Sequence, residues 1–481
     1  MLNEQALLTD LYQLTMAQGY WKGGLSQTEA CFYLHFRENP FEGGYTIACG
    51  FAQVAERAEG FRFTEADRAY LATLKTPQDT PLFEQEFLNT LADFRLTLNI
   101  DAVAEGTAVF PHEPIARVTG PILHCQLFET ILLNLVNYQT LIATKAARVC
   151  EVAKGPVAEF GLRRAQGPAG GLLGSRAAVV GGCSSTSNVE AGRLFGVPVS
   201  GTHAHSWVMA HSSELEAFRA FAEVFPHNSI LLVDTYNTLE GVRNAIIVAK
   251  EMEQRGQRLA GIRIDSGDLA WLSIRAREML DAQGLGYVRI VASNDLDEYT
   301  IQSLHEQGAR IDSWGVGTRL ITAWGQPALT GVYKLCATRQ AGEQRWTPQL
   351  KVSEQTSKST LPGLLAVRRY ADEQGILVGD MVYDEQSQPT DDLIIDPYDD
   401  LRRKNLTGFA HRELLEPLVR DGKAVGGRLS TLEAQENARA NLASLHPTIK
   451  RFLNPHSYPV GLERTLRHQR DEIIRQARAV N

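Results

Sequence analysis

The stretch LAGIRIDSGDL, residues 259–269, contains the pattern that decides the fold of this chain: a short apolar run that ends in Asp265 and a glycine turn. Such a run is typical of a buried parallel strand, and the polar residues after it begin the loop to the next helix. The same pattern, an apolar run ended by polar residues or glycine, recurs in GVPVSGTHAH, SILLVD, YVRIVASN and ARIDSWG.

The spacing of these runs is regular. Asp234 follows Thr202 by 32 residues, and Asp265 follows Asp234 by 31. Ser293 and Gly315 follow at further steps of 28 and 22 residues. Steps of this length fit successive units of one strand and one helix, so we expect a closed or nearly closed α/β barrel, with a doubly wound open sheet as the alternative. In both architectures the active site lies at the carboxyl ends of the strands.

Polar residues or glycine end every one of these predicted strands. A role as a helix N-cap explains Asp234, Asp265 or Ser293 taken singly. Capping explains the polar or glycine ends of five successive strands less well than a shared active site does.

Composition narrows the class of protein. The 481-residue chain has a formal net charge of −8, with 44% hydrophobic and 22% charged residues. This is ordinary for a globular protein and argues against a general nucleic-acid-binding protein, which would usually be basic. We find no run of the ~20 apolar residues that a membrane helix needs and no signal peptide. The six scattered cysteines form no CxxC pair, so we expect reduced thiols. Together these features predict a cytoplasmic protein that binds neither nucleic acid nor membrane.

The barrel pattern occupies the middle of the chain. Residues 122–149 form a long apolar helical pattern, and the glycine-rich stretch at 167–174 is expected to be a flexible loop. Strand-like and then helical patterns follow the barrel. We expect three parts: an N-terminal α+β domain at 1–121, the barrel at 122–329, and a C-terminal segment at 330–481 that packs with the N-terminal domain.

The segment GTHAHSWVMAH, residues 201–211, contains three of the 12 histidines of the chain. On a strand, His203 and His205 would share a face, and such an HxH pair binds metal in metal-dependent amidohydrolases. No other histidine ends a strand to supply a third ligand, and His211 falls within the predicted helix that follows. We therefore favour structural or capping roles over metal ligation.

Two further segments suggest a phosphorylated sugar as the substrate. In RIDSGDL, Arg263 and Asp265 precede a tight glycine turn, where an aspartate can bind Mg²⁺ or accept hydrogen bonds from ribose hydroxyls. In WGVGTRL, residues 314–320, a glycine loop opens a predicted helix whose backbone N–H groups could hold a phosphate. The candidate cations for a polyphosphate are Arg148, Arg163, Arg164, Arg263 and Lys358, each of which could instead form a surface ion pair.

Ten ordered segments resemble the nicotinate phosphoribosyltransferase family: TDLYQLTMAQGYW, FRENPF, EFGLRRAQG, SNVEAGRLFGVPVSGTHAHSWV, DTYNT, IRIDSGDL, SNDLDEYTI, GVGTRL, GVYKL and STLPG. They cover about residues 9–370. The resemblance implies the type II phosphoribosyltransferase fold, an α/β barrel joined to an α+β domain built from the N-terminal and C-terminal segments. It also implies a homodimer with active sites shared across the subunit interface.

The implied reaction is the first step of NAD salvage from nicotinate. Nicotinate and phosphoribosyl diphosphate give nicotinate mononucleotide and diphosphate, and ATP is hydrolysed in a coupled step that uses Mg²⁺. The alternatives are nicotinamide phosphoribosyltransferase, which shares the fold, a metal-dependent amidohydrolase, and a binding protein without catalytic activity.

The resemblance implies roles for single residues. His205 matches the histidine that ATP phosphorylates. Asp234 and Asp265 match acids near the ribose and the metal, with Asp265 as the candidate Mg²⁺ ligand. Arg263 matches a residue near the substrate carboxylate, and its planar guanidinium would favour the acid over the amide because it can pair with a carboxylate through two hydrogen bonds.

Other positions match substrate contacts. Tyr12, supplied across the dimer in relatives, and Phe160 would cover the two faces of the pyridine ring, an arrangement that aromatic stacking favours. Thr202 matches a nicotinate contact. The remaining candidates are Arg163 for substrate binding, Gly315, Gly317 and Thr318 for the 5′-phosphate, and Thr360 for phosphoribosyl diphosphate. Many relatives have an acidic residue where this chain has Ser184.

Overall fold

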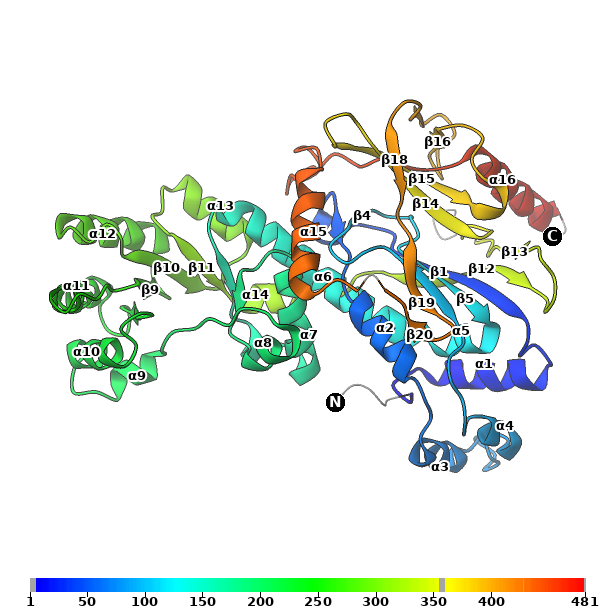
Figure 1. Cartoon of the computed structure of the whole chain (residues 1–481), viewed down its shortest axis with the longest axis horizontal. Helices are drawn as coiled ribbons and strands as arrows, with labels where there is room; N and C mark the ends of the chain where they lie inside the picture. Colours follow the sequence, from blue (N-terminus) through cyan, green and yellow to red (C-terminus); the bar gives the residue numbers. More distant parts are fainter. Residues whose placement is uncertain (1–5, 354–359, 427, 480–481) are drawn as a thin grey trace. The chain divides into compact units, whose positions relative to one another are not determined.

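The computed structural model describes residues 6–353, 360–426 and 428–479 (Figure 1). The chain divides into two compact units, Ile142–Pro327 and Met1–Leu141 with Ala328–Asn481. The first boundary falls within the long helix α6 (Glu129–Ala153). The domain boundaries expected from the sequence, after residues 121 and 329, stay predictions.

A six-stranded, entirely parallel sheet forms the centre of the unit Ile142–Pro327. Its strands, in sheet order, are β7 (Ser185–Thr186), β6 (Val157–Glu159), β11 (Ser313–Val316), β10 (Arg289–Asn294), β9 (Gly261–Ile264) and β8 (Ile230–Leu232). Most of these short strands have an apolar centre, as expected for a parallel sheet that helices cover, and Leu231, Ile262 and Ile290 are fully buried.

The segment 199–203 links the two edges of this sheet. Val199 pairs in parallel with Thr186 of the edge strand β7. At the other edge, the backbone N–H of Leu232 in β8 donates to Nε2 of His203 at 3.2 Å. The chain therefore passes round the sheet in sequence order, from β6 through β7, this segment and β8 to β11, which pairs with β6. This confirms the nearly closed α/β barrel, and the open doubly wound alternative is wrong.

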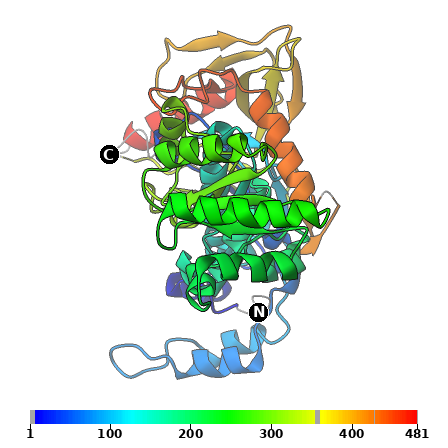
Figure 2. The same cartoon turned by 90° about the vertical axis from the view of Figure 1, so that its left-hand side faces the viewer.

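Helices follow the barrel strands, and side-chain caps fix where three of them begin. After β8, β9 and β10 come α11 (Thr238–Gln254), α12 (Leu269–Ala282) and α13 (Glu298–Glu306). Asn237, Asp268 and Asp297 cap these helices, each accepting a backbone N–H from the first turn. The caps hold the loops at the carboxyl ends of the strands. Figure 2 shows α11 and α12 packed side by side.

The glycine-rich stretch that the sequence assigned to a flexible loop is part of helix α7 (Gly167–Val180), so that prediction is wrong. Pro168 lies in the first helical turn, where its missing N–H costs nothing. A Cβ at Gly171 would come within 2.7 Å of Leu162 Cδ1, so the glycine lets the Leu162 side chain pack closely against the helix. The other helices of this unit are η2 (Leu162–Arg164), α8 (Val189–Phe195), α9 (His205–Met209), α10 (Glu214–Val224) and α14 (Thr318–Ile321).

A buried ion cluster joins α6 to α13. The carboxylate of Glu298 lies 2.7 Å from Lys145 Nζ and 2.9 Å from Arg148 Nε. At most 2% of any of these side chains is exposed. Arg148, a candidate cation for a polyphosphate, therefore has a structural role, because removing its charge would leave Glu298 buried with fewer partners.

The other unit combines both ends of the chain. One sheet joins β1 (Glu29–His35), β3 (Asn99–Ala102) and β5 (Ala116–Pro121) to strands from the C-terminal segment. Those are β12 (Val332–Arg339), β13 (Thr347–Pro348), β19 (Glu416–Arg420) and β20 (Lys423–Ala424). This confirms the predicted α+β domain built from the N-terminal and C-terminal segments.

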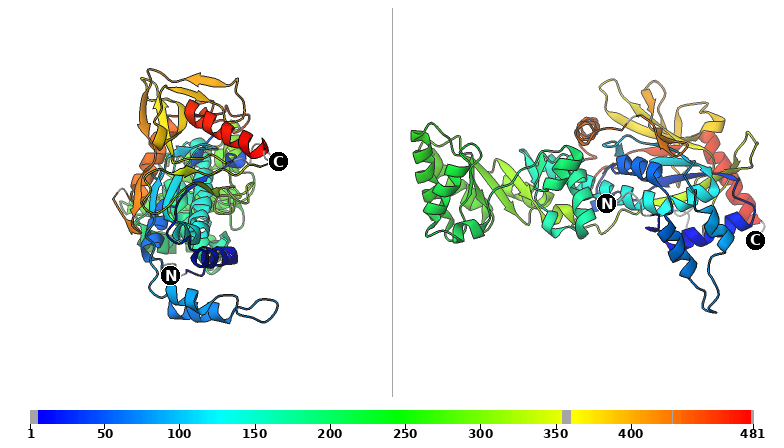
Figure 3. Two further views of the ribbon diagram at one scale, coloured as in Figure 1. Left: turned by 90° about the vertical axis from the view of Figure 1, so that its right-hand side faces the viewer. Right: turned by 60° about the horizontal axis from the view of Figure 1, so that its bottom comes forward.

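A second sheet in this unit comes from the C-terminal segment alone, and α16 (Arg464–Ala479) packs against it (Figure 3). Its strands are β14 (Leu365–Ala371), β15 (Leu377–Asp384), β16 (Leu393–Ile395), β17 (Arg403–Asn405), β18 (Ala410–Glu413) and β21 (Val460–Leu462). The remaining elements are β2 (Thr46–Ile47), β4 (Ala108–Val109), η1 (Pro40–Glu42), α1 (Leu11–Lys22), α2 (Phe51–Gly60), α3 (Glu65–Thr73), α4 (Gln85–Thr90), α5 (Ile122–Leu127), η4 (Glu385–Ser387) and α15 (Thr431–Ala443).

All six cysteines are free thiols. None of the described helices combines the length and apolar character needed to cross a bilayer.

Candidate active site

The carboxyl ends of β8, β9 and β10 bring three predicted site residues together. The backbone N–H of Asp265 donates to Asp234 Oδ2 at 2.9 Å, and the Ser266 hydroxyl donates to the same oxygen at 2.6 Å. The Ser293 hydroxyl in turn donates to Asp265 Oδ1. Hydrogen bonds thus connect three successive strand ends, as the spacing of the apolar runs predicted.

The carboxylates of Asp234 and Asp265 have oxygen atoms that could bind a cation. Asp234 Oδ1 is buried and has no hydrogen-bond partner among the described residues. Magnesium is usually held by one or two carboxylates together with substrate phosphate oxygens, so the acids at this edge fit Mg²⁺. Within the described ranges, no three His, Cys, Asp or Glu side chains come together as a metal-ion cage. A cation here would therefore depend on oxygens that the substrate brings.

His205 lies beside this cluster, and its ring is partly exposed. It is the first residue of α9, and 40% of its side chain is exposed. Its Nδ1 atom lies 3.1 Å from the Thr235 hydroxyl, and its Nε2 atom lies 3.9 Å from Asp265 Oδ2. The imidazole is therefore held beside the acids but remains accessible to a ligand.

His203 is a packing residue with both ring nitrogens engaged. Only 7% of it is exposed, and its ring packs edge-on against Phe221 at 4.7 Å. Since Nε2 accepts the N–H of Leu232, Nδ1 carries the proton and donates to the Ala204 carbonyl at 3.3 Å. The HxH metal site considered from the sequence is therefore wrong, because His203 has no nitrogen to offer a metal.

His211 also has a local structural role. Its Nδ1 atom lies 2.8 Å from the carbonyl oxygen of Trp207, and the two rings pack at 4.7 Å. The expectation that His211 lies within the helix is wrong, because α9 ends at Met209.

Acid should weaken the fold through His203. Burial lowers the pKa of His203 from 6.5 to about 4. Between these values the unfolded chain binds a proton that the folded protein does not, so the stability that the neutral ring contributes is complete above pH 6.5 and is lost as the pH falls towards 4. We expect the stability difference between wild type and His203→Asn to shrink by about 1–2 kcal/mol from pH 7 to pH 5, measured by urea unfolding. The exposed His227→Asn is the control, and an unchanged difference for His203→Asn would contradict the assignment.

Arg263 extends from β9 towards Thr202. One terminal guanidinium nitrogen donates to the Thr202 hydroxyl, and Nε is buried without a partner among the described residues. Burial lowers the pKa of Arg263; Asp265 and Asp234 oppose this shift, and Arg163 adds to it. A half-buried cation with spare donors is suited to bind an anionic group.

Phe160 follows β6 and lies over Gly315 of the neighbouring strand β11. Its backbone N–H donates to the Val316 carbonyl at 2.8 Å. A Cβ on Gly315 would come within 2.6 Å of Phe160 Cδ2, so only glycine leaves room for this ring. Gly317 precedes α14, which begins at Thr318, so the predicted phosphate loop lies at the same edge of the sheet as Phe160.

Glu159 is the site residue that sequence reasoning missed. It is fully buried at the end of β6 and accepts hydrogen bonds from Ser175 Oγ at 2.8 Å and Thr186 Oγ1 at 2.6 Å. Its other oxygen accepts the backbone N–H of Gly161. These bonds fix the turn that carries Phe160. The signal in the sequence is an acid directly before an FG pair at a strand end.

Three other barrel residues lie away from the acid cluster or on the surface. Ser184 is at the amino end of β7, where its hydroxyl donates to the Val157 carbonyl at 3.0 Å. It therefore lies at the end of the sheet opposite to the predicted site. Arg163 and Arg164 are exposed on η2, and the charge of Arg163 acts on Arg263.

Two predicted substrate contacts belong to the unit built from the chain ends. Tyr12 lies on α1 and is 48% exposed, and partial burial together with Glu129 raises its pKa to about 12. Thr360 is 3% exposed, and its hydroxyl accepts the backbone N–H of Lys351 at 2.9 Å. Lys358 lies outside the described residues.

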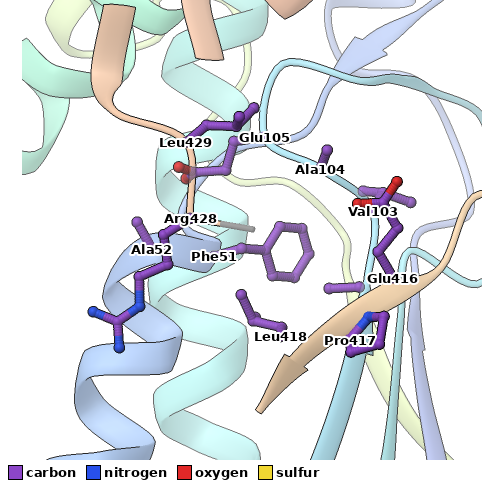
Figure 4. Close-up of a pocket in the computed structure, with 11 residues that line it drawn as sticks. Phe51, Ala52, Val103, Ala104, Glu105, Glu416, Pro417, Leu418, Arg428 and Leu429 are labelled. Carbon is purple, nitrogen blue, oxygen red and sulfur yellow. The ribbon is translucent and has the colours of Figure 1, made fainter. Parts of the chain in front are cut away.

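A small pocket in the same unit contains none of the predicted site residues (Figure 4). Its volume of about 30 Å³ has room for about one water molecule. It is lined by Phe51, Ala52, Ala102, Val103, Ala104, Glu105, Glu416, Pro417, Leu418, Arg428 and Leu429. We therefore place the chemistry at the strand ends of the barrel and not in this pocket.

Known proteins match the chain over nearly its whole length. Residues 7–137, 156–368 and 366–470 match the models of the nicotinate phosphoribosyltransferase (NAPRTase) N-terminal domain, family and C-terminal domain. A nicotinate phosphoribosyltransferase of Bacillus subtilis is 44% identical over 463 residues, which are 95% of this chain and 92% of the relative.

Solved structures agree with these matches. The crystal structure of human nicotinic acid phosphoribosyltransferase superimposes with a TM-score of 0.83 at 32% identity and covers 97% of this chain and 100% of that chain. The nicotinate-nucleotide pyrophosphorylase of Pyrococcus furiosus has the same fold, with a TM-score of 0.69 at 20% identity over 91% of this chain and 95% of that chain.

Proposed function

The chain belongs to the nicotinate phosphoribosyltransferase family, and on that premise we propose how its barrel joins nicotinate to phosphoribosyl diphosphate with ATP as a co-substrate. The products of the transfer are nicotinate mononucleotide and diphosphate, and the reaction belongs to NAD biosynthesis. The observation that carries the proposal is the cluster of Asp234, Asp265, His205 and Arg263 at adjoining strand ends.

Arg263 and Thr202 bind the carboxylate of nicotinate in this proposal. The hydrogen bond between them orients the guanidinium, and its buried Nε supplies a further donor. The pyridine ring lies against Phe160, and Tyr12 of a second subunit covers its other face. Stacking on a flat heteroaromatic ring adds about 0.5–1.5 kcal/mol to the burial of its surface.

The barrel edge then stabilises charge in the transfer step. The pyridine nitrogen attacks the anomeric carbon while the bond to diphosphate breaks, so the ribosyl group passes through a cation-like state. The carboxylates of Asp234 and Asp265 stabilise that positive charge. Bound Mg²⁺, held by Asp265 and substrate oxygens, would neutralise the departing diphosphate. The backbone of Gly315 and Gly317, with Thr318, holds the 5′-phosphate, and Arg163 contacts the substrate.

ATP acts through His205. The imidazole is exposed and lies beside the acids that bind the ribose and the metal, so a phosphoryl group placed there changes the charge of the phosphoribosyl diphosphate site. We expect phosphorylation to tighten that site and thereby to couple ATP hydrolysis to product formation. The working unit is a homodimer with shared active sites.

Product analysis tests this function. The purified protein is incubated with phosphoribosyl diphosphate, Mg²⁺ and either nicotinate or nicotinamide, with and without ATP, and nucleotides are separated by chromatography. We expect nicotinate mononucleotide, faster production with ATP, and ADP formed alongside it. Preferred conversion of nicotinamide would assign the chain to the nicotinamide enzymes, and absence of any nucleotide product would overturn the proposal.

Gly315→Ala should weaken nicotinate binding. The new methyl group would lie within 2.6 Å of Phe160 Cδ2 and displace the ring on which the substrate stacks. Loss of stacking predicts a KM for nicotinate roughly 3- to 10-fold higher, from steady-state kinetics. Gly286→Ala is the matched control, since the nearest atom to its Cβ would be 3.6 Å away. An unchanged KM in Gly315→Ala would remove Phe160 from the site.

A further inference from the structure

We propose that Glu159 is a positioning residue for nicotinate. Its carboxylate is fully buried and therefore touches no substrate atom, but it holds the Phe160 ring in the place where that ring stacks on the substrate. The inference rests on the proposed function, in which the pyridine ring lies against Phe160. It adds the group that places this ring and the side chains through which that group acts.

The carboxylate of Glu159 is part of a closed set of hydrogen bonds. Its Oε2 atom accepts the hydroxyl hydrogens of Ser175 and Thr186, at 2.8 and 2.6 Å. Asn188 connects these two donors, because its Nδ2 donates to Ser175 Oγ at 3.2 Å and its backbone N–H donates to Thr186 Oγ1 at 3.0 Å. The Thr186 hydroxyl therefore accepts from Asn188 and directs its own hydrogen to the carboxylate.

This Glu159 network, made of Glu159, Ser175, Thr186 and Asn188, joins separate elements of the barrel unit. Glu159 ends β6 and Ser175 lies within α7. Asn188 is the N-cap of α8, where its Oδ1 accepts the Ala191 N–H at 3.2 Å. None of the four residues is more than 3% exposed. Since a buried polar group that loses its partner is destabilising, the network favours one arrangement of these elements.

The second carboxylate oxygen connects the network to the turn that carries Phe160. Oε1 accepts the backbone N–H of Gly161. On the other side of the turn, the N–H of Phe160 donates to the Val316 carbonyl at 2.8 Å. A Cβ at residue 161 would come within 2.5 Å of Ile321, so the turn also packs closely against α14. The main chain is thus held on both sides of Phe160, by Glu159 and by β11.

A fixed turn favours binding because stacking depends on where the ring lies. Aromatic rings attract each other in offset or edge-on arrangements with their centroids about 4.5–7 Å apart, so a ring that drifts loses the contact. A turn that first had to be ordered by the substrate would also weaken binding, since ordering costs conformational entropy. Glu159 therefore prepares the stacking face before nicotinate arrives.

Glu159→Gln tests this role with little change of shape. The amide has one acceptor oxygen and one NH₂ group, so it cannot accept all three of the hydrogen bonds that the carboxylate accepts. We expect a KM for nicotinate about 3- to 10-fold higher, the range that follows from lost stacking, with kcat close to wild type. Steady-state kinetics at saturating phosphoribosyl diphosphate and ATP give both constants, and the melting temperature reports folding.

A double-mutant cycle shows whether Glu159 acts through Phe160. In Phe160→Leu the stacking ring is already absent, so adding Glu159→Gln should raise the nicotinate KM no further. An unchanged KM in a folded Glu159→Gln, or the same fold increase with and without the Phe160 ring, would overturn the inference. Wild type that forms no nicotinate mononucleotide would overturn the proposed function instead, so the two failures are distinguishable.

Thr186 supplies a matched pair of variants that keep the carboxylate. Thr186→Val keeps the shape but removes the hydroxyl donor, and it should raise the nicotinate KM in the same direction as Glu159→Gln. Thr186→Ser keeps the hydroxyl and should have a KM near that of wild type. This pair decides the question even if Glu159→Gln fails to fold, because equal KM values in Thr186→Val and Thr186→Ser would show that the network does not place the ring.

Discussion

We expect His205→Asn to form no acid-labile phosphoenzyme from γ-labelled ATP and to lose the stimulation of product formation by ATP. His205 is the histidine of the segment 201–211 with an exposed ring beside the acid cluster, whereas His203 uses both nitrogens in packing. Asparagine can still contact Thr235 but has no nucleophilic nitrogen. The measurements are retention of label on the denatured protein and the ratio of ADP to nicotinate mononucleotide.

A matched control separates this role from a general effect of histidine loss. His211→Asn changes a histidine of the same segment that bonds only to the Trp207 carbonyl in the described structure. It should label like wild type. If His205→Asn still formed acid-labile phosphoenzyme and ATP still accelerated the transfer, another residue would carry the coupling and the assignment of His205 would be wrong.

The second large effect concerns Arg263. We expect Arg263→Ala to raise the KM for nicotinate strongly and to lower kcat/KM by about 30- to 1,000-fold, the range that follows from removing one partner of a buried charge pair. Arg263 lies near the carboxyl end of β9, and its buried Nε has no partner among the described residues, so we propose that its guanidinium binds the nicotinate carboxylate. The preference of the enzyme for nicotinate over nicotinamide should fall in the same variant, because only nicotinate carries the negative charge that Arg263 would bind.

Arg289→Ala is the control for this substitution. Arg289 is an exposed arginine of the neighbouring strand β10, at its amino end, so the variant removes the same side chain from the opposite end of the barrel. Its kinetics should match wild type. A normal nicotinate KM in Arg263→Ala would remove Arg263 from the carboxylate site.

The positions of the strand-end residues could be predicted well from the sequence, because the spacing of the strands determines where these residues lie. Apolar runs ending in Asp234, Asp265 and Ser293 are local patterns, and parallel strands necessarily bring their carboxyl ends to one edge of the sheet. The hydrogen bonds from Asp265 to Asp234 and from Ser293 to Asp265 are the result. The roles of these residues stay predictions, because placement alone does not show which ligand they bind.

Features that depend on tertiary packing could not be predicted in the same way. The stretch 167–174 lies in a helix in which Gly171 packs close to Leu162, whereas a glycine-rich sequence taken by itself favours a loop. The long helical pattern at 122–149 is two helices, α5 and α6, separated at Phe128. Glu159 was missed because its importance comes from partners at Ser175 and Thr186, which are distant in sequence.

A crystal structure with nicotinate mononucleotide would test the central claim most directly, namely that the carboxyl ends of the barrel strands form the transfer site. We predict the pyridine carboxylate within hydrogen-bond distance of Arg263, the ring against Phe160, and the 5′-phosphate on the backbone of Gly315 and Gly317. Nucleotide bound elsewhere, for example in the pocket beside Phe51, with the strand ends unoccupied, would contradict the account.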